Sequence, residues 1–107
     1  MNKRIERVDI ETSISQVFKY RVYKEYECLP ITILEDGEVV NLSEYKAVVY
    51  FKFPNDNIIS FPCLIKNNIV EVPLKKEYFT KEERVLFEIV FTNDNQSVTT
   101  FKMYLDI

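Results

Sequence analysis

Apolar and polar residues alternate along most of this sequence, and the alternation limits the fold more than any other feature. Side chains two positions apart share one face of a β-strand. The pattern is clearest at residues 45–53, where one face would consist of Tyr45, Ala47, Val49, Phe51 and Phe53. No stretch keeps the 3.6-residue period of an amphipathic helix for more than about a turn or two. The sequence therefore predicts an all-β protein.

Turn residues separate the alternating stretches. Asp36-Gly37 predicts a hairpin, because glycine readily adopts the positive φ that a two-residue hairpin turn requires. Further turns are expected at residues 54–57, 67–68 and 93–96. The last of these would join residues 85–91 and 99–107 as an antiparallel hairpin.

The alternation is interrupted at two places. Between Lys75 and Glu83 it lapses, and Thr80 and Glu83 have the spacing of a capping box, which predicts a short helical crossover. Pro62 falls inside the strand expected at residues 59–65 and has no amide hydrogen to donate. A proline at such a position predicts that the strand lies at a sheet edge.

Short strands with turns roughly every 8 to 12 residues are typical of a two-sheet sandwich. The sequence predicts one domain, residues 1–107, that folds as an immunoglobulin-like two-sheet antiparallel sandwich of about seven to eight strands with one short helical crossover. A small closed barrel is the alternative. The core would be formed mainly by Phe18, Ile31, Ile33, Val49, Phe51, Phe61, Val70, Val72, Phe87, Ile89, Phe101 and Met103.

The residues that usually carry catalysis are scarce. The chain has no histidine, which removes the commonest general base and the commonest metal ligand. Its single glycine, Gly37, cannot form a phosphate-binding loop, and its two cysteines, Cys28 and Cys63, cannot form a structural zinc site by themselves. Both cysteines are interpreted as small apolar core residues. The sequence predicts a protein that is not an enzyme and uses no metal or cofactor.

Acidic and amide side chains leave two further options. The dense pairs of acids are Glu25 with Glu27 and Glu82 with Glu83. Such pairs can hydrolyse glycosides when they are held at the right separation, but solvated surface charge is the favoured interpretation. The Asn-Asp-Asn segments at residues 55–57 and 93–95 could offer oxygens to calcium. Turns stabilised by these side chains are the favoured interpretation there.

The distribution of charge argues against several classes of partner. The formal net charge is −3, from 14 Lys and Arg against 17 Asp and Glu, and both signs are scattered, so no patch that would neutralise nucleic-acid phosphates is expected. No apolar run of about 18 residues and no basic amphipathic helix indicates a membrane role. The basic N-terminus is followed by Glu6 and Asp9 instead of the apolar segment of a signal peptide, which predicts a compartment that keeps thiols reduced.

Three tyrosines and an arginine gather in one segment. Tyrosine and arginine are enriched at the centres of protein interfaces, so this segment predicts a protein-interaction site. Its residues are Tyr20, Arg21, Tyr23 and Tyr26. The alternative is that these tyrosines cover an edge of the sandwich. Exposed edge strands would also allow the chain to form a homo-oligomer.

The succession of motifs is itself informative. In order along the chain these are the Asp36-Gly37 turn, the Asn41-Leu42 step, the strand at 47–52, the hairpin at 68–74 and the closing hairpin at 87–103. From Tyr20 onward this order resembles the N-terminal domain of the phage baseplate upper proteins of siphophages and prophages of Gram-positive bacteria. The family often has glycine where this chain has Lys24-Glu25 and Glu82-Glu83.

The resemblance implies an immunoglobulin-like domain of a phage or prophage tail baseplate that docks onto the tail hub and carries receptor-binding proteins. It implies a virion tail location, assembly in the bacterial cytoplasm, and other tail proteins as partners. In that family more chain usually follows this domain, which implies here an excised domain or a reduced stand-alone version. A carbohydrate-binding module is the alternative from another functional class, suggested by tyrosine-rich faces and paired acids.

Overall fold

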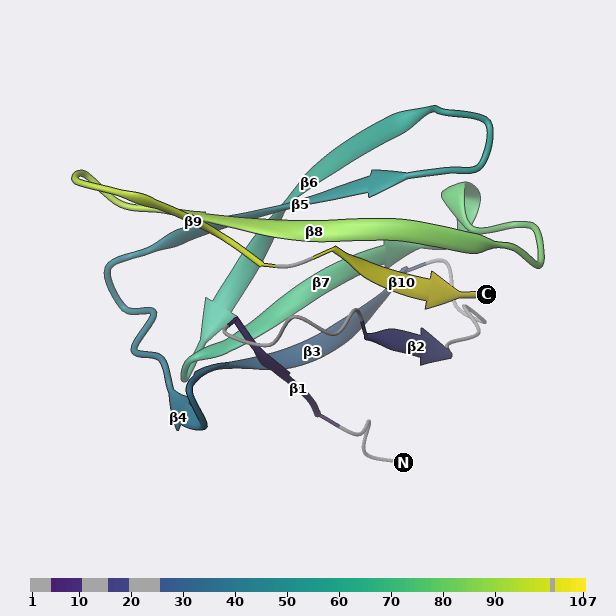
Figure 1. Cartoon of the computed structure of the whole chain (residues 1–107). Coiled ribbons are helices and arrows are strands. Elements are labelled where there is room, and N and C mark those ends of the chain that lie inside the picture. Colours follow the sequence, from purple (N-terminus) through teal and green to yellow (C-terminus); the bar gives the residue numbers. More distant parts are fainter. Residues whose placement is uncertain (1–4, 11–15, 20–25, 101) are drawn as a thin grey trace.

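The computed structural model describes residues 5–10, 16–19, 26–100 and 102–107, and of Tyr26 the backbone alone. These residues form strands and one short 3₁₀ helix, η1, which confirms the all-β prediction (Figure 1). The elements are β1 (Glu6–Asp9), β2 (Val17–Lys19), β3 (Tyr26–Glu35), β4 (Glu38–Val39), β5 (Lys46–Lys52), β6 (Ile58–Lys66), β7 (Ile69–Lys75), η1 (Lys76–Tyr78), β8 (Arg84–Thr92), β9 (Ser97–Thr99) and β10 (Met103–Asp106). No helix in the described part of the chain has the length and apolar character needed to cross a membrane.

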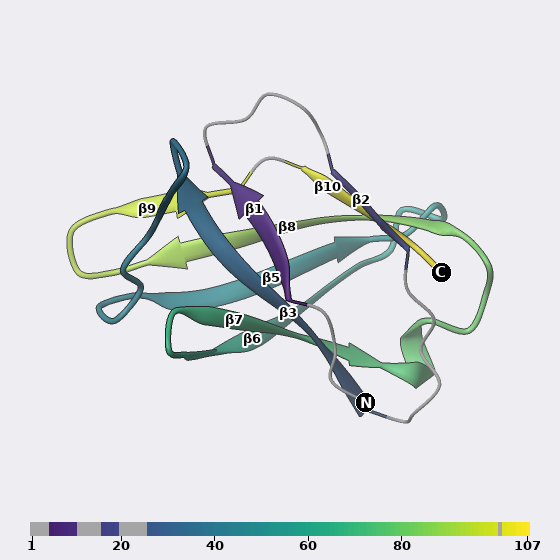
Figure 2. The same cartoon turned by 90° about the horizontal axis from the view of Figure 1, so that it is seen from below.

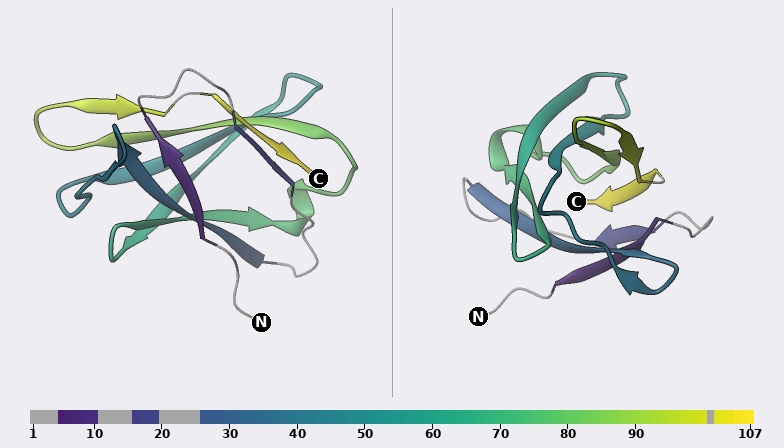
Figure 3. Two further views of the ribbon diagram at one scale, coloured as in Figure 1. Left: turned by 60° about the horizontal axis from the view of Figure 1, so that its bottom comes forward. Right: turned by 90° about the vertical axis from the view of Figure 1, so that its left-hand side faces the viewer.

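The ten strands of the described residues form one sheet that curls around the core (Figures 1 and 3). Its order is β1-β3-β7-β6-β5-β8-β10-β2, with β4 beside β3 and β9 beside β8. The curl passes through β6, because residues 58–63 pair with β5 while residues 64–66 pair with β7. A sandwich consists of two separate sheets packed face to face. The predicted immunoglobulin-like two-sheet sandwich is therefore replaced by a curled open sheet.

The two edges of the sheet are formed by the consecutive strands β1 and β2. β1 pairs in parallel with β3, and β2 pairs in parallel with β10, whereas the predicted sandwich is antiparallel throughout. Parallel partners cannot be joined by a tight turn, so no hairpin signal in the sequence could reveal them. Figure 2 shows β1 beside β3 and β2 beside β10. Among the described residues β1 does not pair with β2, so the sheet does not close into the alternative barrel.

The predicted hairpin turns are present. Asp36 and Gly37 have φ angles of 52° and 83°, and they join β3 to β4. Asn67 and Asn68 have φ angles of 53° and 62°, and they join β6 to β7. Two successive positive φ angles are the property of the type I′ turn, whose twist matches that of the flanking strands. The expected closing hairpin is also confirmed, since β9 and β10 both pair antiparallel with β8.

The crossover between β7 and β8 contains the predicted helical turn, although at another place. It lies at η1, and the expected capping box at residues 80–83 is wrong because those residues are not helical. The next residue, Phe79, is buried, with its ring centroid 5.1 Å from that of Phe51 and 5.7 Å from that of Phe53. Burial of this ring draws the chain into the core directly after η1, before the capping residues are reached.

The edge predicted at Pro62 exists for part of its strand only. β6 as a whole is an interior strand of the sheet order. Its residues 58–63, however, pair with β5 alone, so the described chain has no strand on the other side of Pro62. The missing amide hydrogen of proline therefore costs no ladder hydrogen bond on that side.

The core follows the predicted faces closely. Ten of the twelve predicted core residues are buried, Phe61 is half-buried, and Phe101 lies outside the described residues. At its centre, the ring of Phe51 lies 5.8 Å from that of Phe87, 6.4 Å from that of Phe61 and 5.1 Å from that of Phe79, measured between centroids. Phe51 therefore connects β5, β6, β8 and the crossover.

Phe51→Ala should lower the free energy of unfolding by about 3–5 kcal/mol, because truncation of a fully buried ring removes apolar burial and leaves a cavity. Chemical denaturation would measure the loss. Val39→Ala is the control, since this side chain is 54% exposed and its truncation should change stability by less than about 0.5 kcal/mol. A loss in Phe51→Ala no larger than that of the control would contradict this description of the core.

A bidentate ion pair connects β8 to β10. Arg84 Nε and Nη2 donate to Asp106 Oδ1 and Oδ2 at 2.7 and 2.9 Å. This hydrogen bonding is the main cause that lowers the pKa of Asp106 below its usual 3.8. A carboxyl group whose folded pKa is lowered adds stability at pH values above its unfolded pKa, and this stability is lost as the pH falls through the folded pKa.

Asp106→Asn should therefore cost stability at neutral pH, and the difference from the unmodified chain should shrink as the pH falls below 3.8. Urea denaturation at a series of pH values would measure it. Arg84→Gln should give the same pH dependence, because it removes the other half of the pair. A difference that stays constant between neutral pH and pH values well below 3.8 would contradict the assignment.

Candidate protein-interaction site

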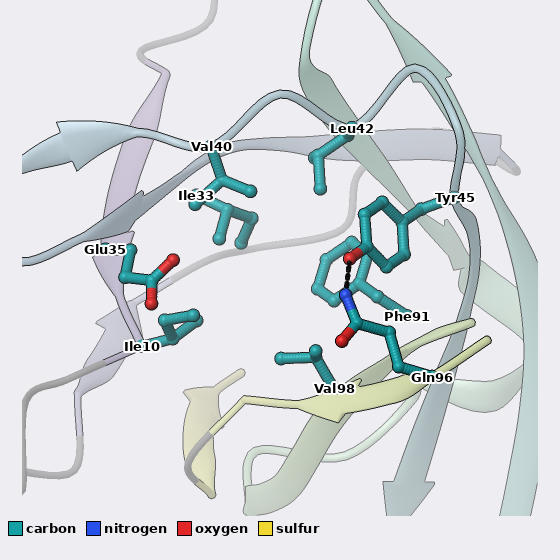
Figure 4. A pocket seen from close by; sticks show the side chains of 9 residues that line it. All are labelled: Ile10, Ile33, Glu35, Val40, Leu42, Tyr45, Phe91, Gln96 and Val98. Atoms are coloured by element: carbon teal, nitrogen blue, oxygen red, sulfur yellow. Dashed lines mark hydrogen bonds between the residues drawn. The ribbon is translucent and has the colours of Figure 1, made fainter. Parts of the chain in front are cut away.

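A pocket of about 280 Å³ opens at one end of the curled sheet (Figure 4). It lies among the end of β1, the end of β3, the loop between β4 and β5, and the hairpin of β8 and β9. Its apolar walls are made by Ile10, Ile33, Val40, Leu42, Phe91 and Val98, and its polar groups come from Glu35, Tyr45 and Gln96. We call it the end pocket.

The polar groups occupy two sides of the end pocket. On one side, Gln96 Nε2 donates a hydrogen bond to the Tyr45 hydroxyl, and Figure 4 shows this pair beside the ring of Phe91. Gln96 is held by its turn, because its backbone amide donates to Asn93 Oδ1 at 2.9 Å. On another side Glu35, an exposed residue, presents its carboxylate. The pocket is thus apolar inside, with one neutral and one anionic group at its rim.

Hydrogen bonds between distant segments fix the pocket walls. The Asp9 carboxylate accepts from the backbone amides of Asp36 at 3.1 Å and Gly37 at 2.8 Å, which ties the end of β1 to the β3–β4 turn. Leu42 donates its backbone amide to Asn68 Oδ1 at 2.9 Å, which ties the loop after β4 to the β6–β7 turn. Two walls of the pocket are therefore held by hydrogen bonds that lie outside it.

One of the four predicted interface residues, Tyr26, lies among the described residues. Tyr20, Arg21 and Tyr23 lie outside the described residues. Tyr26 begins β3, where its backbone pairs with Lys75, at the opposite end of the strand from Glu35. The sequence reasoning missed the end pocket, although the Asp36-Gly37 turn marks one of its walls.

The other candidate sites have structural explanations. Glu27, expected as solvated surface charge, is only 8% exposed, because it shares the inward face of β3 with Leu29 and Ile31; Glu25 lies outside the described residues. In the two Asn-Asp-Asn segments, the Oδ1 atoms of Asn55 and Asn93 accept backbone amides two residues further on, so both are turns as expected. Among the described residues, no three His, Cys, Asp or Glu side chains lie close enough together to hold a metal ion.

The two cysteines are half-buried. Burial raises the pKa of the Cys63 thiol to about 12, so it is protonated at neutral pH and is a poor nucleophile. Cys63 packs against the apolar core, in agreement with its prediction as a small core residue.

Two further features lie on the surface. On the outer side of β5 and β6, the side chains of Tyr50, Ile58 and Leu64 are exposed. A wide hollow of about 520 Å³ lies between the β5–β6 turn and the crossover, with polar groups from Asn57, Glu77 and others beside the half-exposed ring of Tyr78.

Comparison with known proteins places the fold. No protein-family model and no curated protein matches the chain. Among solved structures, it is similar to one described as "N-terminal domain of phage TP901-1 ORF48". The TM-score is 0.68 at 8% sequence identity, and the match covers 95% of this chain and 94% of that one. The likeness is therefore one of fold, and it extends over nearly all of both chains.

Asp9→Ala should lower the free energy of unfolding by about 1–2 kcal/mol, because it removes a charged acceptor from two backbone amides. Asp9→Asn keeps one side-chain oxygen and should lose about half as much. Denaturation would measure stability, and the amide NMR signals of Asp36 and Gly37 would report the turn. Asp94→Ala, in the exposed β8–β9 turn, is the control; an equal loss there would contradict the role given to Asp9.

Proposed function

We propose that this chain is a non-catalytic structural domain of a phage or prophage tail baseplate, which links the tail hub to receptor-binding components. It acts by contact with other tail proteins, is assembled in the bacterial cytoplasm and ends up in the virion tail. The observation that carries this proposal is the fold match to the N-terminal domain of a phage protein over 95% of the chain.

Two further observations support the proposal. The order of turns and strands in the sequence from Tyr20 onward resembles the N-terminal domain of phage baseplate upper proteins. The chemistry of the chain favours binding over catalysis, since it has no histidine and the Cys63 thiol is held protonated. A preformed apolar pocket with a few polar groups is suited to recognition.

Carbohydrate binding is the second candidate, and the hollow beside Tyr78 is the observation that favours it. Asn55, Asn57 and Glu77 offer hydrogen-bonding groups there, next to a partly exposed aromatic ring. The Tyr78 ring lies 5.5 Å from that of Phe61, which holds it in place. Sugar recognition commonly combines ring stacking with such polar groups.

Virions of the phage or prophage that encodes this chain should contain it in their tails. Inactivating its gene should give tails that lack receptor-binding components and no longer adsorb to the host, because the link to the hub is missing. Mass spectrometry of purified, washed particles and electron microscopy of tails would test both points. A chain absent from washed particles, or tails that adsorb normally without it, would overturn the proposal.

A glycan array measured with the purified chain separates the two candidates. Binding that is lost in Tyr78→Ala and kept in Tyr50→Ala would favour the carbohydrate-binding module. The tail proposal predicts no glycan binding that depends on Tyr78.

A further inference from the structure

We propose that the end pocket receives a large apolar side chain from a partner protein, and that Lys or Arg residues flanking that side chain bind the carboxylates around the pocket. This inference rests on the proposed function in one respect, because it takes the partner to be another tail protein. The recognition chemistry follows from the pocket itself, through its size, its walls and the charge around it.

The size of the end pocket suits a single side chain. Pockets that bind small-molecule ligands usually measure roughly 300–1,000 Å³. The end pocket, at about 280 Å³, lies just below that range. Interfaces between proteins are anchored by aromatic or long side chains that fill such well-formed pockets. A pocket of this volume can take a phenylalanine or leucine side chain.

The walls require an apolar occupant. Ile10, Val40 and Val98 are only partly buried, although they pack against the core, so their remaining surface faces solvent in the pocket. An apolar side chain that enters would remove this surface from water. The polar groups Tyr45 and Gln96 already bond to each other, so the occupant need not satisfy them.

The charge around the pocket is negative. Glu35 lines the pocket, and Glu38 is its direct partner across the β3–β4 hairpin, so the two carboxylates share one face of that hairpin. Among the described residues that line the pocket there is no Lys or Arg to offset this charge. Complementary charge steers association and rejects partners of the wrong sign, so this rim favours a basic segment.

The outer face of β5 and β6 has no comparable preference. Around Tyr50 and Ile58, the shallow hollow is lined by Lys52 and Lys102 together with Glu88, so both signs of charge are present. Nothing there selects one class of partner. This face therefore serves as the control surface.

Two tripeptides test the proposal on the full chain: acetyl-Lys-Phe-Lys-amide and acetyl-Glu-Phe-Glu-amide. They would be titrated against isotope-labelled protein while the NMR signals of the Val40, Val98 and Ile33 methyl groups are followed. We expect the lysine peptide to shift these methyl signals with at least a tenfold lower Kd than the glutamate peptide. Acetyl-Lys-Ala-Lys-amide should bind several-fold more weakly than the phenylalanine peptide, because its side chain leaves the pocket largely unfilled.

Variants separate the two parts of the recognition. Val98→Trp should abolish binding by filling the pocket. The double substitution Glu35→Gln with Glu38→Gln changes exposed residues, so it should fold normally, and it should remove most of the difference between the lysine and glutamate peptides. Ile58→Ala, on the outer face, should leave both affinities unchanged. Equal binding of the two peptides, or shifts centred on Tyr50 and Ile58, would overturn the proposal.

Failure of the pocket proposal can be distinguished from failure of the proposed function. If the lysine peptide binds but the chain is absent from virions, the pocket chemistry stands and the tail partner is wrong. If the chain is present in virions but no peptide perturbs the pocket methyl groups, the pocket proposal is overturned and the tail role stands.

Discussion

The architecture depends on β6, which changes its hydrogen-bonding partner from β5 to β7 along its length. Where it pairs with β5, it has separated from β7, and the crossover packs at this opening. The Tyr78 ring lies 5.5 Å from that of Phe61, and the Lys75 ammonium lies 5.0 Å from the centre of the same ring. Phe79 then reaches the core against Phe51. One end of the curl is thus filled by aromatic rings from the crossover, while the end pocket lies at the other.

The sequence predicted the strand faces and turns, which depend on residues close together in the chain. The alternation in β5 and β8 places Val49, Phe51, Phe87 and Ile89 inside, as the pattern indicates, because the period of a strand leaves each side chain only two directions. The asparagine pair at 67–68 forms its hairpin because asparagine tolerates positive φ better than most residues. Such features follow from the local sequence alone. They account for most of the agreement between the predicted fold and the structure.

The failures concern contacts between segments far apart in the chain. The parallel pairing of β1 with β3 and the shared strand β6 depend on which elements meet in space, and no local signal encodes this. The end pocket is a similar case, since four separate segments leave a space between them. Six of its nine lining residues are apolar, and such residues suggest only a core when they are read in the sequence.

A fold shared at 8% identity shows how little of the sequence the architecture requires. Alternating apolar rows and a few turn residues can be supplied by many sequences, so residues outside those rows are free to vary without loss of the fold. Glu35 and Glu38 are of this kind, because both are exposed and neither contributes to the core. Their presence around an apolar pocket is therefore not a requirement of folding. Selection for a partner can act on surface features that stability does not require. The end pocket differs in this respect from the apolar rows that build the sheet.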